Sequence, residues 1–125
     1  MELSVSTYEM PDGSQQVEIT ANGQKQRFTA EQLSLYIELL SLARADMLPP
    51  VPMETPAIAG MQNVAVDPPV RWAYDEMNDH AALVIRHPGH GWIGYSLPFQ
   101  TVDALRHGLQ QLDEFRSAQR QRPMN

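Results

Sequence analysis

The stretch Gln16–Leu33, QVEITANGQKQRFTAEQL, contains the signals that decide the local fold. Its apolar residues first alternate with polar ones over residues 16–20, as expected for a half-buried strand. The dipeptide Asn22-Gly23 tolerates the positive φ angles of a type I′ turn. The sequence therefore predicts a hairpin whose second strand covers residues 24–28.

A helix is expected directly after this hairpin. Thr29 can cap the helix and Gln32 can reach back to it, while Phe28 before the cap and Leu33 after it are both apolar. This pattern predicts a capping box with a hydrophobic staple. The helix is expected to run to about Asp46, because the prolines that follow cannot continue it.

The apolar side of this helix is wider than usual. Leu35, Leu39 and Leu42 widen the stripe to an arc of roughly 220°, whereas an ordinary surface helix has an apolar arc of about 100°. Such a helix has more apolar surface than one face of a sheet can cover.

The same order of elements is expected on either side of a proline-rich segment. Alternating apolar residues predict further strands over residues 3–8, 70–75, 82–87 and 92–97. Residues Val64–Val66 are expected to pair only briefly. A second helix follows Pro98, with a normal apolar stripe of Val102, Leu105, Leu109 and Leu112.

We therefore expect an α+β fold with an antiparallel sheet of five to seven strands and two helices on one face. The order is β-β-β-α, linker, β-β-β-α, in a single domain 1–125. Its parts are a unit 1–46, a Pro/Met-rich linker or arm 47–69, a unit 70–118 and a polar tail 119–125. Thr7–Met10 aligns with Ala73–Glu76, which suggests an internal repeat without requiring one.

Composition excludes several classes of protein. The 125 residues contain no cysteine, which excludes disulfide scaffolds and thiol chemistry. The first residues lack a secretory pattern and the longest apolar run is far too short to span a bilayer, so we expect a cytoplasmic, non-membrane protein. A net charge of −6 makes nucleic acid an unlikely partner.

The negative charge is confined to the first part of the chain. Up to Val70 there are nine acidic residues and three basic ones, whereas six acidic and six basic residues follow. Ordinary compositional bias explains this, but an acidic surface that selects a basic partner is also compatible with it.

The segment Met47–Gln62 contains four prolines, three methionines and a single charged residue. Such a composition favours an extended backbone. Because the segment is apolar between its prolines, it can lie along a hydrophobic groove of this molecule or of a partner.

Histidines give the best candidate for a metal site. His87 and His90 flank a tight turn, and His80 lies in the preceding turn. A strand of this length would hold His80 and His90 roughly 20 Å apart, so a third ligand would have to come from elsewhere. We therefore expect no bound metal and no cofactor, with solvated turn histidines as the simpler interpretation.

Other constellations are weaker. The three carboxylates of Asp75, Glu76 and Asp79 are close in sequence and are candidates for acid–base chemistry. Solvent at a hairpin end should, however, leave their pKa values ordinary. Strand aromatic residues can stack on nucleobases, but we expect them to fill the core between sheet and helices; they are Trp72, Tyr74, Trp92 and Tyr95.

We therefore expect a small non-enzymatic protein–protein interaction domain of accessory, chaperone, adaptor or inhibitor type. It would act through the apolar helix face and the Pro-rich arm, by helix-to-helix dimerisation or arm exchange between protomers. The alternatives are a His-centred metal or enzymatic site and single-stranded nucleic-acid binding. The expected interaction residues are Leu35, Leu39, Leu42, Met47, Pro50 and Met53.

Overall fold

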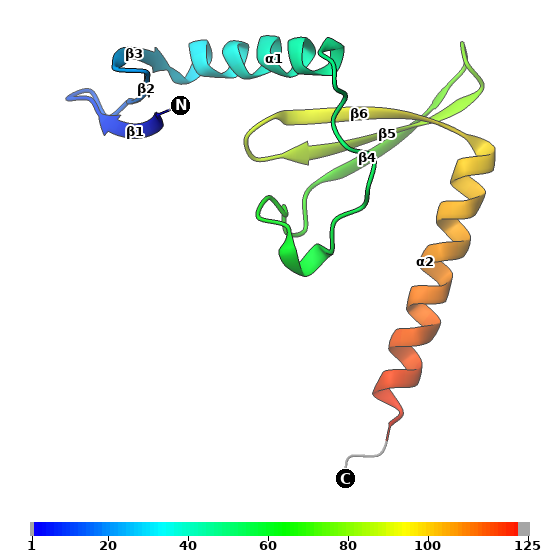
Figure 1. Ribbon diagram of the computed structural model, residues 1–125. Helices are drawn as coiled ribbons and strands as arrows, with labels where there is room; N and C mark the ends of the chain where they lie inside the picture. The colour runs from blue at the N-terminus through cyan, green and yellow to red at the C-terminus, as the bar shows by residue number, and fades with distance from the viewer. Residues whose placement is uncertain (1, 123–125) are drawn as a thin grey trace. The chain divides into compact units, whose positions relative to one another are not determined.

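The computed structural model describes residues 2–122 of the chain. The chain divides after Val64 into two compact units, which we call the N-unit and the C-unit. Each unit consists of three antiparallel strands followed by a helix (Figure 1).

The N-unit is a meander of β1 (Leu3–Glu9), β2 (Gln15–Ala21) and β3 (Gln24–Thr29), with β2 in the centre. Asn22 and Gly23 adopt φ angles of 51° and 82°, as the predicted turn requires. The expected hairpin is therefore confirmed.

The pairing register separates the two faces of this sheet. Directly paired residues of antiparallel strands project to the same side. Val5 pairs with Ile19, and Val17 pairs with both Thr7 and Phe28, which makes one face mainly apolar. Charged and polar residues form the other face.

Helix α1 (Ala30–Asp46) begins with the predicted capping box. The backbone N–H of Gln32 donates to the Thr29 hydroxyl at 3.2 Å, and the backbone N–H of Thr29 donates to the Gln32 side chain at 3.0 Å. These two bonds satisfy backbone donors that a helix N-terminus leaves unpaired. They also fix the point at which the chain leaves β3.

The C-unit repeats this order with β4 (Val70–Asp75), β5 (His80–His87), β6 (Gly91–Pro98) and α2 (Phe99–Arg120). The central strand is β5, and its pairing places most of the larger apolar side chains on one face, with Val84 and Trp92 on the other; those on the first face are Val70, Trp72, Tyr74, Leu83, Ile85, Ile93, Tyr95 and Leu97.

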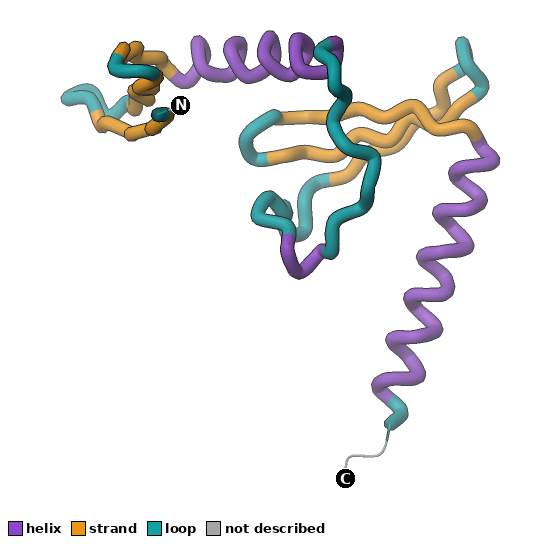
Figure 2. The backbone as a smooth tube through the Cα atoms, in the orientation of Figure 1, coloured by secondary structure: helices purple, strands orange, loops and turns teal. Residues whose placement is uncertain are grey.

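The segment between α1 and β4 has no strand, only the short 3-10 helix η1 (Ile58–Gly60), as Figure 2 shows. The guanidinium of Arg44 donates to the carbonyl of Pro49 at 3.0 Å and holds the start of this segment against the end of α1. The brief strand expected over residues 64–66 is absent from the structure.

The α+β class and the order β-β-β-α, β-β-β-α are confirmed. The prediction of a single sheet of five to seven strands with both helices on one face is wrong, because the strands form two separate three-stranded sheets. The segment between α1 and β4 contains no strand that would join one sheet to the other. Helix α2 runs to Arg120, past the expected boundary at 118, and positions 123–125 of the expected tail lie outside the described residues.

The repeat is closer in topology than in sequence. Tyr8 and Tyr74 align by sequence, but Tyr8 pairs with Gln16 on the polar face, whereas Tyr74 pairs with Ala81 on the apolar face. The hairpin loops differ by one residue, which reverses the side to which an aligned residue projects. A true duplication, like the single domain 1–125, stays a prediction.

No side chain among the described residues is buried. Leu33 and Ile37 of α1 and most of β2 and β5 are half-buried, and these residues form what core each unit has. Each unit therefore leaves most of its apolar surface uncovered by its own elements.

Removing the cap of α1 tests the role of Thr29. We expect Thr29→Ala to lower the free energy of unfolding by about 1 kcal/mol, because the N–H of Gln32 loses its acceptor. Thr29→Ser keeps a hydroxyl and should stay close to the parent. Urea unfolding followed by far-UV circular dichroism measures the difference, and equal stability of all three chains would contradict the assignment.

Candidate interaction surface

An apolar groove runs between β3 and α1. Phe28 lies on the apolar face of the sheet, and its ring packs against that of Tyr36 with centroids 5.0 Å apart. The groove is lined by Gln26, Arg27, Phe28, Gln32, Leu35, Tyr36 and Leu39.

Helix α1 covers the sheet only near its own start. It contacts β3 and β2, the two strands closest to the capping box. Leu39, more than two turns into the helix, remains 56% exposed, and Leu40 and Leu42 are exposed as well. The leucines beyond the groove therefore continue its apolar surface along the helix.

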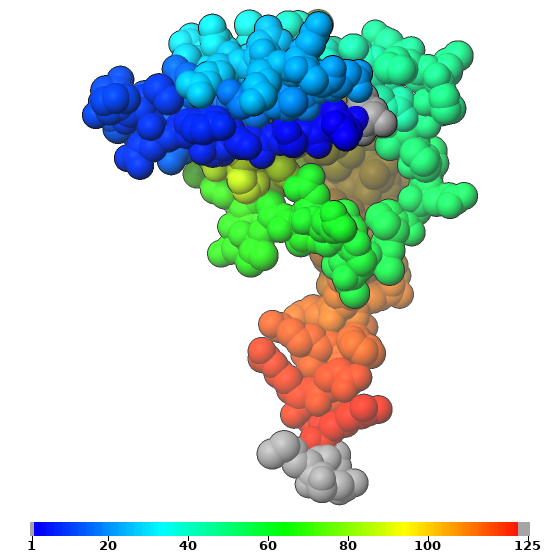
Figure 3. All heavy atoms as spheres, turned by 60° about the vertical axis from the view of Figure 1, so that its left-hand side comes forward, coloured from blue at the N-terminus to red at the C-terminus, as the bar shows by residue number. Residues whose placement is uncertain are grey.

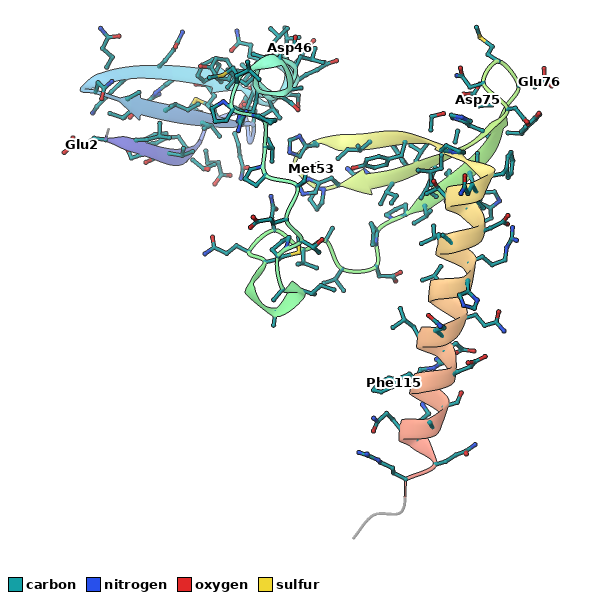
Figure 4. The ribbon with its side chains drawn as sticks, turned by 45° about the vertical axis from the view of Figure 1, so that its right-hand side comes forward. Glu2, Asp46, Met53, Asp75, Glu76 and Phe115 are labelled. Carbon is teal, nitrogen blue, oxygen red and sulfur yellow. The ribbon has the colours of Figure 1, made fainter. Side chains whose placement is uncertain are left out.

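The structure brings some of the expected interaction residues together. Leu35 and Leu39 line the same groove, whereas Leu42 lies further along the helix outside it. Met47 is the C-cap residue of α1, and Pro50 follows in the exposed segment. Met53 is 95% exposed. Figure 4 labels it in the same segment.

Acidic residues flank the apolar surface of α1. Glu31 and Glu38 lie on the helix and Asp46 ends it, against a single base, Arg44. Arg44 is already engaged with the carbonyl of Pro49.

Another base of this unit is also paired. Arg27 bonds to the carboxylate of Glu18 at 3.1 Å, and its guanidinium lies 4.6 Å from the ring centre of Tyr8. Arg27 and Glu18 offset each other, and Arg44 offsets one of the three acids of α1, so the helix keeps a net negative charge near the groove.

The C-unit exposes a second apolar surface on its sheet. Tyr74 contacts Phe99 at the start of α2 with ring centroids 6.2 Å apart, but Trp72 on the same face is 79% exposed, and Tyr95 is exposed too. The expectation that these rings fill a core is therefore wrong. Helix α2 meets the sheet only near its start, so its length does not cover them.

Trp92 differs from the other aromatic residues. It pairs with Arg86 on the opposite face of the sheet, where Arg71 also lies. The four aromatic residues thus do not form one stacking platform.

Three polar groups meet at one end of this sheet. Ser96 Oγ lies 2.9 Å from His80 Nδ1 and 3.4 Å from a carboxylate oxygen of Asp75. A carboxylate only accepts, so the 3.4 Å contact has the hydroxyl donating to Asp75, whereas the donor of the shorter contact with His80 Nδ1 depends on the imidazole tautomer. In a serine nucleophile site the histidine lies between the hydroxyl and the acid, whereas here the hydroxyl lies between His80 and Asp75. This cluster therefore ties three strands together.

The second pair of histidines forms a turn. His87 Nδ1 accepts the backbone N–H groups of Gly89 and His90 at 3.0 and 3.1 Å, and the two imidazole rings are 4.9 Å apart. Because the lone pair of His87 Nδ1 accepts these two bonds, this nitrogen is not available as a metal ligand. Among residues 2–122, no group of three or more His, Asp or Glu side chains is placed to hold a metal.

Hydrogen bonding shifts two pKa values at the β4–β5 turn. The side chain of Asn78 holds the pKa of Asp75 below its ordinary value, with smaller help from Ser96, so the expectation of ordinary carboxylates there is wrong for Asp75. Tyr74 donates its hydroxyl to Asp79 at 2.7 Å, and this bond raises the pKa of Tyr74. Both effects stabilise a turn and do not create a reactive group.

Comparison with protein-family models, curated proteins and solved structures found no match for this chain. In the part of the chain that the structure describes, no helix combines the length and apolar character needed to cross a membrane. Cytoplasmic localisation stays a prediction.

The structure differs from the sequence-based predictions in two features of the C-unit. The sequence predicts that the aromatic face is covered and that both helices pack on one face of the sheet. The signal for the first was the alternation of Trp72 and Tyr74 on an edge strand. The direct continuation of β6 into α2 at Phe99 was the signal for the second.

The Tyr74–Asp79 bond predicts a pH dependence. The folded pKa of Tyr74 is raised above its unfolded value, so its stabilising contribution is fully present below about pH 10 and is lost as the pH rises through the folded pKa. We expect Asp79→Asn to lower the pKa of Tyr74, while asparagine still tolerates the positive φ at this position. NMR titration of ring-labelled tyrosine measures the change. Asp46→Asn is the control, and an unchanged Tyr74 titration in Asp79→Asn would contradict the assignment.

Proposed function

We propose that the chain is a non-enzymatic protein–protein interaction domain that binds a partner protein through the apolar surface of α1. Leu35, Leu39 and Leu42 would form its centre, and the Pro/Met segment with Met47, Pro50 and Met53 would extend it. The observation that carries this proposal is that α1 leaves these leucines exposed. Exposed apolar residues that form one surface bordered by polar residues are typical of sites that bind other proteins.

The groove supplies a place for an anchoring side chain. Phe28 and Tyr36, whose rings pack together, line it along with Leu35 and Leu39. Apolar or aromatic anchors that enter such grooves contribute much of the binding free energy in protein interfaces.

The acidic residues around the leucines of α1 limit the kind of partner protein that this surface fits. The acidic residues Glu31, Glu38 and Asp46 lie on or at the end of the helix that carries the leucines. A partner with an apolar anchor and basic residues around it would complement this surface and would associate faster at low salt.

Single-stranded nucleic acid is less well supported as a partner. The register places Trp72, Tyr74 and Tyr95 on one face of the C-unit sheet, whereas Arg71 and Arg86 project to the opposite face, where Trp92 is the one ring beside them. Base stacking needs cationic groups beside it to hold the phosphates.

An enzymatic role is supported by no group among the described residues. The Ser96 hydroxyl lies between His80 and Asp75, which is not the order of a serine nucleophile site, and His87 Nδ1 accepts two N–H groups of its own turn. A non-enzymatic domain remains our proposal.

Photo-cross-linking tests the α1 surface directly. We replace Leu35 with benzoylphenylalanine in the full chain, irradiate it in the native host and identify the adducts by mass. A specific adduct is expected from position 35, and a much weaker one from position 41, because Ser41 lies on the polar side of the same helix. Equal products from both positions, or none from either, would contradict the proposal.

A negative charge introduced into the leucine surface is compared with the same charge on the polar side of α1. Leu39→Glu should reduce the adduct from position 35 by about tenfold or more, because burying an unpaired carboxylate costs well over the free energy of one decade in affinity. Ser41→Glu adds the same charge to the polar side and should leave the yield unchanged. An equal loss in both variants would sink the assignment to the leucine surface.

A further inference from the structure

Helix α2 carries an apolar stripe that its own unit leaves open beyond Val102, which is half-buried. The helix has 22 residues and is about 33 Å long, yet it meets β5 and β6 only near its start. Leu105 and Leu109 are exposed, and Leu112 is 64% exposed. The later turns extend away from the sheet of the same unit (Figures 1 and 3).

The spacing of this stripe is that of a helix pair. Val102, Leu105, Leu109 and Leu112 follow one another at intervals of three, four and three residues, which are positions a, d, a and d of two heptads. A stripe of this kind packs against another helix more readily than against a sheet.

We propose that α2 binds the α2 helix of a second copy of this chain, in antiparallel orientation. This inference goes beyond the proposed function, because it concerns a different helix and a different occupant. In the arrangement that buries all four stripe residues, Val102 lies opposite Leu112 of the second copy, and Leu105 lies opposite its Leu109.

The charges beside the stripe favour this arrangement. Arg106 and Asp113 both occupy position e, which borders the stripe on one side. In the antiparallel pair this side of one helix meets the same side of the other. Arg106 of each copy then lies about 7.5 Å along the axis from Asp113 of the other, a distance that two long side chains can span.

The direction of helical side chains selects this pairing. Side chains on a helix lean toward its N-terminus, so Arg106 and Asp113 of the two copies lean toward each other. The two copies of Arg106 lie nearer to each other along the axis, but their side chains lean apart. Two opposite-charge pairs therefore form across the interface.

The salt bridges that Arg106 and Asp113 form within their own helix do not prevent them from pairing with the second copy. Arg106 bonds to Asp103 and Arg116 bonds to Asp113 within the helix, with all four side chains well exposed. Exposed ion pairs of this kind contribute little to stability, so the groups are free to face a second copy as well.

A parallel pair lacks this complementarity. It would place Gly108 beside Asp113 and Thr101 beside Arg106, so neither charge would meet an opposite one. It would also bring Arg116 of both copies to the same layer of the stripe, where like charges repel.

Gly108 is consistent with a close neighbour on this helix. Glycine inside a helix costs about 1 kcal/mol relative to alanine. A Cβ built at Gly108 meets nothing within 4 Å, so the chain's own packing does not require glycine there. In the antiparallel pair Gly108 lies near the two-fold axis, beside Gly108 of the second copy, where the helices can approach each other.

The sequence alone pointed to residues 33–42 for self-association. Two copies of α1 would bring Glu31, Glu38 and Asp46 of each copy together, with only Arg44 to offset them. The charges of α2 are self-complementary and those of α1 are not. We therefore assign the second copy to α2 and leave α1 for a partner protein.

Sedimentation equilibrium of the full chain at micromolar concentration tests the pair. We expect a dimer that Leu109→Glu converts to a monomer, while Gln111→Glu, on the outer side of the same helix, leaves the dimer intact. A parent chain that stays monomeric up to the highest soluble concentration would overturn the proposal.

Charge reversal tests the orientation. Arg106→Glu and Asp113→Arg should each weaken the dimer about tenfold, because each replaces two attractive pairs by two repulsive ones. The double variant Arg106→Glu/Asp113→Arg should recover dimerisation, since the exchanged charges then attract each other across both pairs. Each change also disturbs a pair within the helix, so a purely intrahelical effect would make the double variant the weakest.

Mixing the two single variants gives the sharpest result. Chains carrying Arg106→Glu and chains carrying Asp113→Arg are complementary to each other across both pairs, so a heterodimer should form where each alone is weakened. Failure of both the double variant and the mixture to recover would overturn the antiparallel pairing.

The outcomes separate this proposal from the function of α1. Leu39→Glu should leave the dimer intact, and Leu109→Glu should leave the specificity of cross-linking from position 35 unchanged. Loss of the dimer in Leu39→Glu with none in Leu109→Glu would overturn the assignment to α2.

Discussion

The constraint on which the rest depends is the direct continuation of the last strand of each meander into its helix. Thr29 ends β3 and Ala30 begins α1, and Pro98 and Phe99 join β6 and α2 in the same way. With no loop between strand and helix, the helix cannot turn back along the sheet, and only its first turns cover it. The exposed leucines of α1, the open aromatic face of the C-unit and the free stripe of α2 all follow from this connection.

Local structure was predictable because it depends on neighbours in the sequence. Asn22-Gly23, the Thr29/Gln32 box and the prolines after Asp46 fixed the elements of the N-unit to within a residue. The number of sheets was not predictable in this way. Strand patterns show which residues alternate, but they do not show which strands pair, and the absence of a ladder between the units had no local signal.

The candidate site was only partly predictable for the same reason. Leu35, Leu39 and Leu42 could be identified from the width of the apolar arc, which is a property of one helix. Whether Trp72 and Tyr95 are covered depends on the direction in which α2 leaves the sheet. That direction is set by the single junction at Phe99, which the apolar pattern does not describe. The pairing register adds information that the composition lacks, since it separates Trp72, Tyr74 and Tyr95 from Arg71 and Arg86 and leaves only Trp92 beside these arginines.

The position of β1 at the edge of its sheet has a consequence for solubility. Its outer edge presents unpaired backbone groups along a strand with no charge between its ends, LSVSTY, which is the kind of edge that adds strands from other molecules. Glu2 precedes this strand and Glu9 ends it, so a carboxylate lies at each end. These two acids act as gatekeepers against growth of the sheet, and part of the negative charge of the N-unit thereby protects the chain from aggregation.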